Sequence, residues 1–97
     1  MIEHQQIREE IQKHKSSLRR QYGVRSLGLF GSYARNQQGP RSDIDILVDF
    51  NAPIGLLRFA QLERNLGQLL GRKVDLVMKS ALKPRIGRHI LEEVIPL

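Results

Sequence analysis

Glycine, serine and aspartate residues are spaced in this chain as a site for a triphosphate and a divalent cation requires. Gly31-Ser32 directly follows an apolar run, and after ten further residues Asp43-Ile44-Asp45 opens the next one. Glycine at such a turn lets the backbone approach a ligand closely. The serine hydroxyl can cap a helix or reach a phosphate oxygen, and N–H groups at a helix start favour an anion. The segment therefore indicates transfer chemistry on a nucleoside triphosphate.

The two aspartates of this segment are predicted to share one face of a strand. Side chains alternate along a strand, so Asp43 and Asp45 point the same way, roughly 6–7 Å apart along the backbone. Two carboxylates at that spacing repel each other unless a cation lies between them. Oxygen ligands of this kind suit Mg²⁺, which takes further ligands from phosphates. Arg35 adds a fixed positive charge near the turn, and two roles stay open for it: a contact to a phosphate or a surface ion pair.

A third carboxylate has a similar setting in the run Lys73-Val74-Asp75-Leu76-Val77-Met78. An aspartate inside an apolar strand is costly unless it is exposed, paired or bound to a metal. If this strand lies beside the strand that carries Asp43 and Asp45, Asp75 completes a cluster of three carboxylates. Each element alone is commonly a plain turn or a solvated edge strand. The combination of all three indicates a site.

The combined pattern resembles a known family. Gly31-Ser32, ten residues, Asp43-Ile44-Asp45 and a later Asp75 are similar to the motif of the DNA polymerase β-type nucleotidyltransferase superfamily. The small size and the strings GSYAR and SDIDILVDF resemble its minimal nucleotidyltransferase (MNT, MntA-like) branch, over nearly the whole chain.

This resemblance implies an activity and roles for the motif residues. It implies two Mg²⁺ ions, ATP as donor, and in-line attack of an acceptor hydroxyl on the α-phosphorus. Asp43, Asp45 and Asp75 would be the catalytic metal ligands, with Gly31 and Ser32 on the triphosphate. Members of this branch act as antitoxins that transfer AMP to a tyrosine of a HEPN-domain ribonuclease toxin. The resemblance therefore implies a Mg²⁺-dependent protein adenylyltransferase with a HEPN toxin as partner in a hetero-oligomer.

Two other classes of function stay open. One is a non-catalytic antitoxin that blocks the toxin by binding alone. The other is a nucleotidyltransferase that acts on RNA or on a small-molecule hydroxyl. The formal net charge is +6, and residues 1–42 carry eight Lys/Arg against three Glu, which would attract a triphosphate, RNA or an acidic partner. Only five aromatic residues are present, so a platform for stacking bases is not evident, and nucleic acid is not the favoured partner.

Length and composition predict one domain over residues 1–97, without room for a separate acceptor-binding domain. The chain has no cysteine, and therefore no disulfide framework. No run has the eighteen or so apolar residues that span a membrane, and no signal-peptide core is evident. We expect a cytoplasmic protein with no membrane partner.

Apolar periodicity predicts an α/β (α+β) architecture. Helices are expected from Ile2 to about Tyr22, between Ile54 and Leu70, and from Pro84 to before Pro96, with a short helix after Ser32. Strands are expected over 24–30, 43–50 and 73–78. The expected fold is the nucleotidyltransferase fold, a small mixed three-stranded sheet flanked by about four helices. The apolar stripe of each helix is expected to face the core. In the last helix this stripe is formed by Ile86, Ile90, Leu91 and Val94.

Overall fold

The computed structural model describes residues 3–97, beginning with a long helix, α1 (His4–Tyr22). Ile2, where the helix was expected to start, lies outside the described residues. Glu3 and Gln6 form a reciprocal capping box at the start of α1. Gly23 ends the helix in the left-handed region, with φ of 70°. Of the apolar stripe predicted for this helix, Ile7, Ile11 and Leu18 are at most 2% exposed, and Tyr22 is half-buried.

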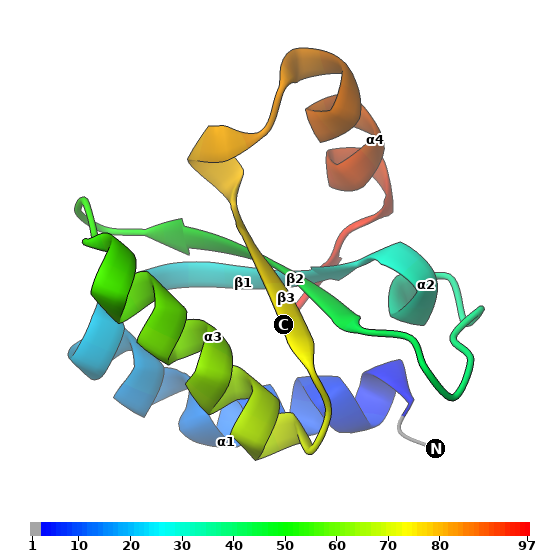
Figure 1. Ribbon diagram of the computed structural model, residues 1–97, viewed down its shortest axis with the longest axis horizontal. Coiled ribbons are helices and arrows are strands. Elements are labelled where there is room, and N and C mark those ends of the chain that lie inside the picture. The colour runs from blue at the N-terminus through cyan, green and yellow to red at the C-terminus, as the bar shows by residue number, and fades with distance from the viewer. Residues whose placement is uncertain (1–2) are drawn as a thin grey trace.

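The sheet has four strands in the order β3-β2-β1-β4 (Figure 1). They are β1 (Val24–Phe30), β2 (Ile44–Phe50), β3 (Val74–Met78) and the two-residue β4 (Ile95–Pro96). β1 pairs with β2 and β4 in antiparallel fashion, and β2 pairs with β3 in parallel. The prediction of a mixed sheet is confirmed, but it missed one strand. Pro96 was expected only to stop the last helix, whereas an edge strand of two residues carries no periodic signal and tolerates proline.

One face of the sheet carries the core. α1 and α3 (Leu56–Leu70) lie side by side across this face (Figure 1). The apolar side of β2 packs beneath them, with Ile44, Ile46 and Val48 at most 1% exposed. From α3, Leu62 and Leu66 are fully buried in the same cluster. Alternation along β2 therefore sends its aspartates to the opposite face.

The opposite face is covered only in part. α2 (Gly31–Ala34) lies at the end of β1, and α4 (Pro84–Glu93) stands off the sheet after the short helix η1 (Lys79–Ala81) (Figure 1). The expectation that the α4 stripe is core was wrong for two of its residues, because Ile86 is 58% exposed and Leu91 46% exposed. α4 meets the rest of the protein mainly through its C-terminal end, so most of its length has no layer to pack against.

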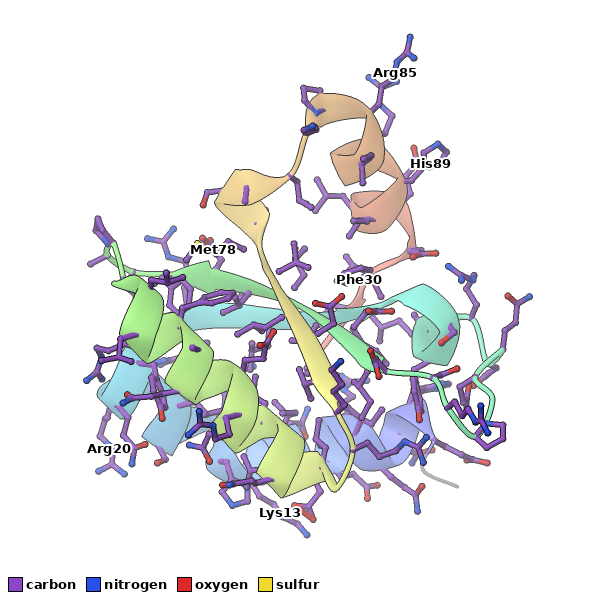
Figure 2. All side chains as sticks on the ribbon, in the orientation of Figure 1. Lys13, Arg20, Phe30, Met78, Arg85 and His89 are labelled. Atoms are coloured by element: carbon purple, nitrogen blue, oxygen red, sulfur yellow. The ribbon has the colours of Figure 1, made fainter. Side chains whose placement is uncertain are left out.

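Basic side chains of α1 and α4 point outward. Lys13 and Arg20 project from the outer side of α1, while Arg85 and His89 project outward from α4 (Figure 2). These side chains form solvated helix faces. No helix among residues 3–97 combines the length and the apolar character needed to cross a lipid bilayer.

Candidate active site

Two of the predicted site residues lie directly opposite each other on neighbouring strands. In the parallel pairing of β2 and β3, Asp45 is the register partner of Asp75. Register partners on adjacent strands project to the same face, with backbones about 4.8 Å apart. Asp45 is half-buried and Asp75 exposed, on the face opposite the core. The pairing brings together two carboxylates that are thirty positions apart in the chain.

Asp43 precedes this pair at the entrance to β2, since the strand begins at Ile44 rather than at Asp43. Its carboxylate lies 3.9 Å from Nζ of Lys73, and both side chains are well exposed. The loop before it is held locally, because the N–H of Gly39 donates to the Ser42 hydroxyl at 2.9 Å. The main-chain N–H of Ile44 donates to the carbonyl of Lys73 at 2.9 Å, which joins the starts of the two strands.

The carboxylates of the site act on one another electrostatically. The pKa of Asp45 is raised to about 6, first by burial and then by the negative charges of Asp75 and Asp43. Arg35 opposes this shift, and Glu93 adds to it. A carboxylate that is destabilised by its own neighbours is a group whose ionised form a cation would stabilise.

The donor set has the chemistry of a hard-cation site. Carboxylate oxygens are the ligands that Mg²⁺ prefers, and the mutual repulsion around Asp45 fits a bound cation. Across residues 3–97, however, no three side chains of His, Cys, Asp or Glu are gathered tightly enough to hold a metal ion. Asp45 and Asp75 share a face, and Asp43, which contacts Lys73, lies close enough to raise the pKa of Asp45. Their shared role as ligands stays a prediction.

The glycine of the motif is packed against one of the aspartates. Gly31 has φ of 75°, which disfavours residues with a Cβ. A Cβ at this position would collide with the carboxylate of Asp45. The turn from β1 into α2 therefore needs glycine for two reasons, the backbone conformation and the close approach. The predicted triphosphate turn and the predicted cation ligand are direct neighbours.

The two other predicted nucleotide contacts belong to α2 or follow it. Ser32 is half-buried in the first turn of α2. The guanidinium of Arg35 donates from Nε to Gln37 at 3.2 Å and from Nη1 to Oε2 of Glu93 at 3.0 Å. Arg35 lies close enough to Asp45 to lower the pKa of that carboxyl. Gly31, Ser32, Arg35 and Asp45 therefore occupy one end of the open face.

Glu93 is the residue of this region that the sequence analysis missed. It is the last residue of α4, and its Oε1 accepts from the main-chain N–H of Gly31 at 3.0 Å. That hydrogen bond is the main cause of the lowered pKa of Glu93, assisted by Arg35. A signal was present, because Glu93 follows Ile86 by seven positions and Ile90 by three, on the predicted apolar side of the helix.

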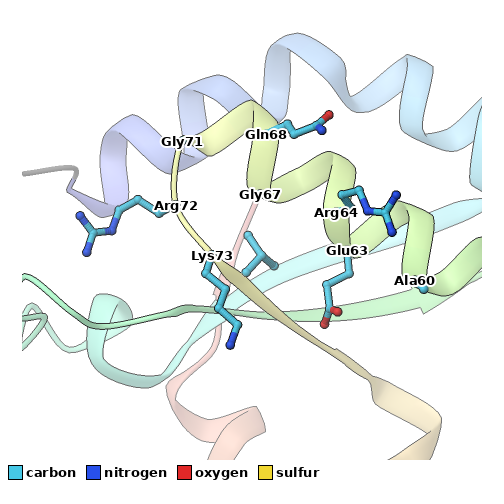
Figure 3. A pocket seen from close by; sticks show the side chains of 9 residues that line it. Ala60, Glu63, Arg64, Gly67, Gln68, Gly71, Arg72 and Lys73 are labelled. Atoms are coloured by element: carbon cyan, nitrogen blue, oxygen red, sulfur yellow. The ribbon is translucent and has the colours of Figure 1, made fainter.

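An open pocket lies elsewhere, at the outer edge of β3 beside the end of α3 (Figure 3). It has a volume of about 590 Å³, and none of the three site aspartates lines it. Glu63 accepts from the N–H of Leu76 there at 2.9 Å, which protects the edge of the sheet. Arg64, Arg72 and Lys73 make its rim basic, and Lys73 links this rim to Asp43.

Comparisons with known proteins identify the family of this chain. The sequence model of the Nucleotidyltransferase domain family matches residues 11–97. The protein adenylyltransferase MntA of Thermococcus cleftensis is 47% identical over 95 residues, which cover 98% of this chain and 96% of the relative.

Solved structures extend the likeness to the fold. A structure described as a candidate minimal nucleotidyltransferase has a TM-score of 0.83 and 35% identity, over 99% of this chain and 97% of the other. A chain from the crystal structure of a toxin-antitoxin with AMP-PNP has a TM-score of 0.74 and 26% identity, over 88% of this chain and 69% of the other. By its sequence, its fold and its enzyme class, this chain belongs to the nucleotidyltransferase domain family.

Proposed function

We propose that this protein is a protein adenylyltransferase that transfers AMP from ATP to a tyrosine of a HEPN-domain toxin and so acts as its antitoxin. The register of Asp45 and Asp75, with Gly31 packed against Asp45, is the observation that carries the proposal. Two relatives support it: the MntA relative is named a protein adenylyltransferase, and a structural neighbour comes from a toxin-antitoxin complex with an ATP analogue.

In the proposed reaction, the acceptor hydroxyl oxygen bonds to the α-phosphorus of ATP. The bond from that phosphorus to the α,β-bridging oxygen breaks, and pyrophosphate leaves. Asp75 is more exposed than Asp45, and we assign it to accept the proton of the hydroxyl. Gly31, Ser32 and Arg35 orient the triphosphate, so the reacting phosphorus lies near Asp45 and Asp75.

Asp43, Asp45 and Asp75 would hold Mg²⁺, with two ions expected. When bound, magnesium supplies neutralisation of charge on the phosphates and on the transition state. Holding it also requires Asp43 to exchange its contact with Lys73 for a ligand role. Both side chains of that pair are well exposed, so the exchange costs little.

The test is transfer of label from ATP labelled at the α-phosphate. The chain is incubated with Mg²⁺ and a HEPN protein encoded beside it, and label is followed on protein, on total RNA and on aminoglycosides. The proposal expects label on the HEPN protein and loss of labelling with Asp43→Ala. If the HEPN protein stays unlabelled while Asp43→Ala still neutralises it, the protein is a binder rather than an enzyme. Label on RNA alone would replace the proposed acceptor.

The potency of toxin neutralisation distinguishes an antitoxin that acts by binding alone from one that acts as an enzyme. Wild type and the Asp43→Asn/Asp45→Asn variant are compared at equal concentration against the toxin. Catalytic neutralisation predicts that the variant is much weaker, because catalysis turns over and stoichiometric binding does not. Equal potency would favour the binder. Size-exclusion chromatography of the mixture tests the predicted hetero-oligomer separately.

A further inference from the structure

One carboxylate joins the last helix to the glycine turn and to the arginine that follows α2. The side chain of Glu93 accepts from the main-chain N–H of Gly31 at Oε1 and from Nη1 of Arg35 at Oε2, each at 3.0 Å. The two contacts span 62 and 58 positions of the chain. Both partners are among the residues predicted to bind the triphosphate. This bridge therefore links the C-terminal part of the chain directly to the proposed nucleotide site.

Glu93 is itself held in place by the fold. α4 ends there, with the N–H of Val94 donating to the carbonyl of Ile90 at 2.9 Å. β4 then pairs with β1, and the N–H of Leu97 donates to the carbonyl of Leu27 at 2.9 Å. The side chain of Val94 packs so closely on Gly28 that a Cβ would not fit there. The backbone that carries Glu93 is thereby tied to the strand that leads into Gly31.

The bridge limits how Arg35 can move. Arg35 is 48% exposed, so without partners its long side chain would sample many rotamers. Nε donates to Gln37 and Nη1 donates to Glu93, and two fixed nitrogens set the plane of the guanidinium. Within residues 3–97, Nη2 makes no hydrogen bond, so its N–H groups remain available to a phosphate.

We propose that Glu93 is a positioning residue for nucleotide binding, whose carboxylate holds the Gly31 turn and the Arg35 guanidinium in the geometry that receives the triphosphate. This inference rests on the proposed function. It means that part of the ordering of Arg35 is complete before ATP arrives, which lowers the cost of binding. A carboxylate so near a triphosphate also repels it. If Glu93 instead competed with the phosphates for the N–H of Gly31 and for Arg35, removing its charge would tighten nucleotide binding.

The experiment measures binding of α,β-methylene-ATP with Mg²⁺ by calorimetry, together with the melting temperature, for wild type, Glu93→Gln and Glu92→Gln. Glutamine can still accept from Gly31 but carries no charge for Arg35. Glu92 is the matched control, an exposed neighbour on the same helix. We expect the Kd of Glu93→Gln for the nucleotide to rise roughly three- to tenfold, because the Arg35 side chain would then have to be ordered when the nucleotide binds. Glu92→Gln should match wild type.

A double-variant cycle with Arg35→Lys separates positioning from general stability. Lysine lacks the fork that Glu93 aligns, so Glu93→Gln should change the Kd less in that background. In transfer assays the KM for ATP should rise with Glu93→Gln while kcat changes less than twofold.

Three results overturn the inference. Tighter binding by Glu93→Gln would make Glu93 a competitor of the phosphates. An unchanged Kd with a lower melting temperature would make the bridge purely structural. Either result leaves the proposed function intact. Absence of nucleotide binding by wild type would instead refute the proposed function, and the positioning role with it.

Discussion

Asp45 lies directly opposite Asp75 in the parallel pairing of β2 and β3, on the face of the sheet that α1 and α3 leave open. The pairing places two negative charges side by side at a cost in stability. The pKa of Asp45, raised to about 6 by burial and by its acidic neighbours, expresses that cost. The site is strained electrostatically in the absence of a cation.

This strain predicts that Asp45→Asn stabilises the protein when no divalent cation is present. A raised carboxyl pKa means that the folded state binds the proton more tightly, so stability is lost as pH rises from about 4 to 6. Asparagine carries no charge to be destabilised. At pH 8 we expect a gain on the order of 1 kcal/mol, after a discount for partial solvent exposure. Urea unfolding in a chelating buffer measures it.

The same comparison contains its own controls. At pH 3.5 both carboxyl and amide are neutral, so the two proteins should be nearly equal in stability. Magnesium added at pH 8 should stabilise wild type more than the variant. A variant less stable than wild type at pH 8 without metal would show that repulsion does not dominate at this position.

The proton-acceptor role predicts a loss of transfer on Asp75→Asn. We expect the rate of AMP transfer to fall by roughly 10²–10⁴, because a positioned base contributes about that factor. Asp49→Asn is the matched control, since Asp49 shares the acidic side of β2 but pairs with Arg25 at 3.7 Å. Circular dichroism should show both variants folded. Comparable losses in the two variants would point to the overall charge of this region of the sheet instead.

The Gly31 turn predicts a large cost for a single methyl group. Gly31→Ala forces alanine into a left-handed conformation and against the Asp45 carboxylate. We expect a loss of about 1–3 kcal/mol in the free energy of unfolding, measured in urea. Gly39→Ala is the control, because a Cβ there meets nothing within 4 Å. Its effect should stay within about 0.5 kcal/mol.

The Glu93 bridge predicts a pH-dependent contribution to stability. The pKa of Glu93 is lowered, first by the hydrogen bond from Gly31 and then by Arg35. A lowered carboxyl pKa contributes stability that is present above the ordinary pKa and is lost as pH falls through the lowered one. Wild type should therefore melt higher than Glu93→Gln at pH 7, and the difference should shrink as pH falls below the ordinary carboxyl pKa and vanish once Glu93 is protonated in the folded state. A difference that does not depend on pH would contradict this linkage.

The buried stripe of α3 and the exposed stripe of α4 predict a large and a small cost, respectively, when an apolar side chain is truncated. Leu66→Ala, in the fully buried stripe of α3, should cost about 2–5 kcal/mol. Ile86→Ala, on the exposed side of α4, should change the free energy of unfolding by less than about 0.5 kcal/mol. Chemical denaturation of both variants checks the contrast. A large cost for Ile86→Ala would mean that this side of α4 is covered in solution.

Local features of this protein were readable from the sequence. The alternation of Ile44, Ile46 and Val48 with aspartates identified the buried and open sides of β2, because strand geometry has a period of two. The need for glycine at position 31 followed from its place between a strand and a helix. The stripes of α1 and α3 predicted their buried faces. Each of these conclusions depends on neighbours within a few residues.

Other features depend on contacts between distant parts of the chain, and only the tertiary structure decided them. Strand register sets whether Asp75 meets Asp45, and no local pattern encodes it. Whether the stripe of α4 is buried depends on what packs over it, and little does. Glu93 reaches Gly31 because β4 pairs with β1, an edge pairing of two residues too short to leave a periodic signal. Composition alone could not distinguish that bridge from an exposed glutamate at the end of a helix.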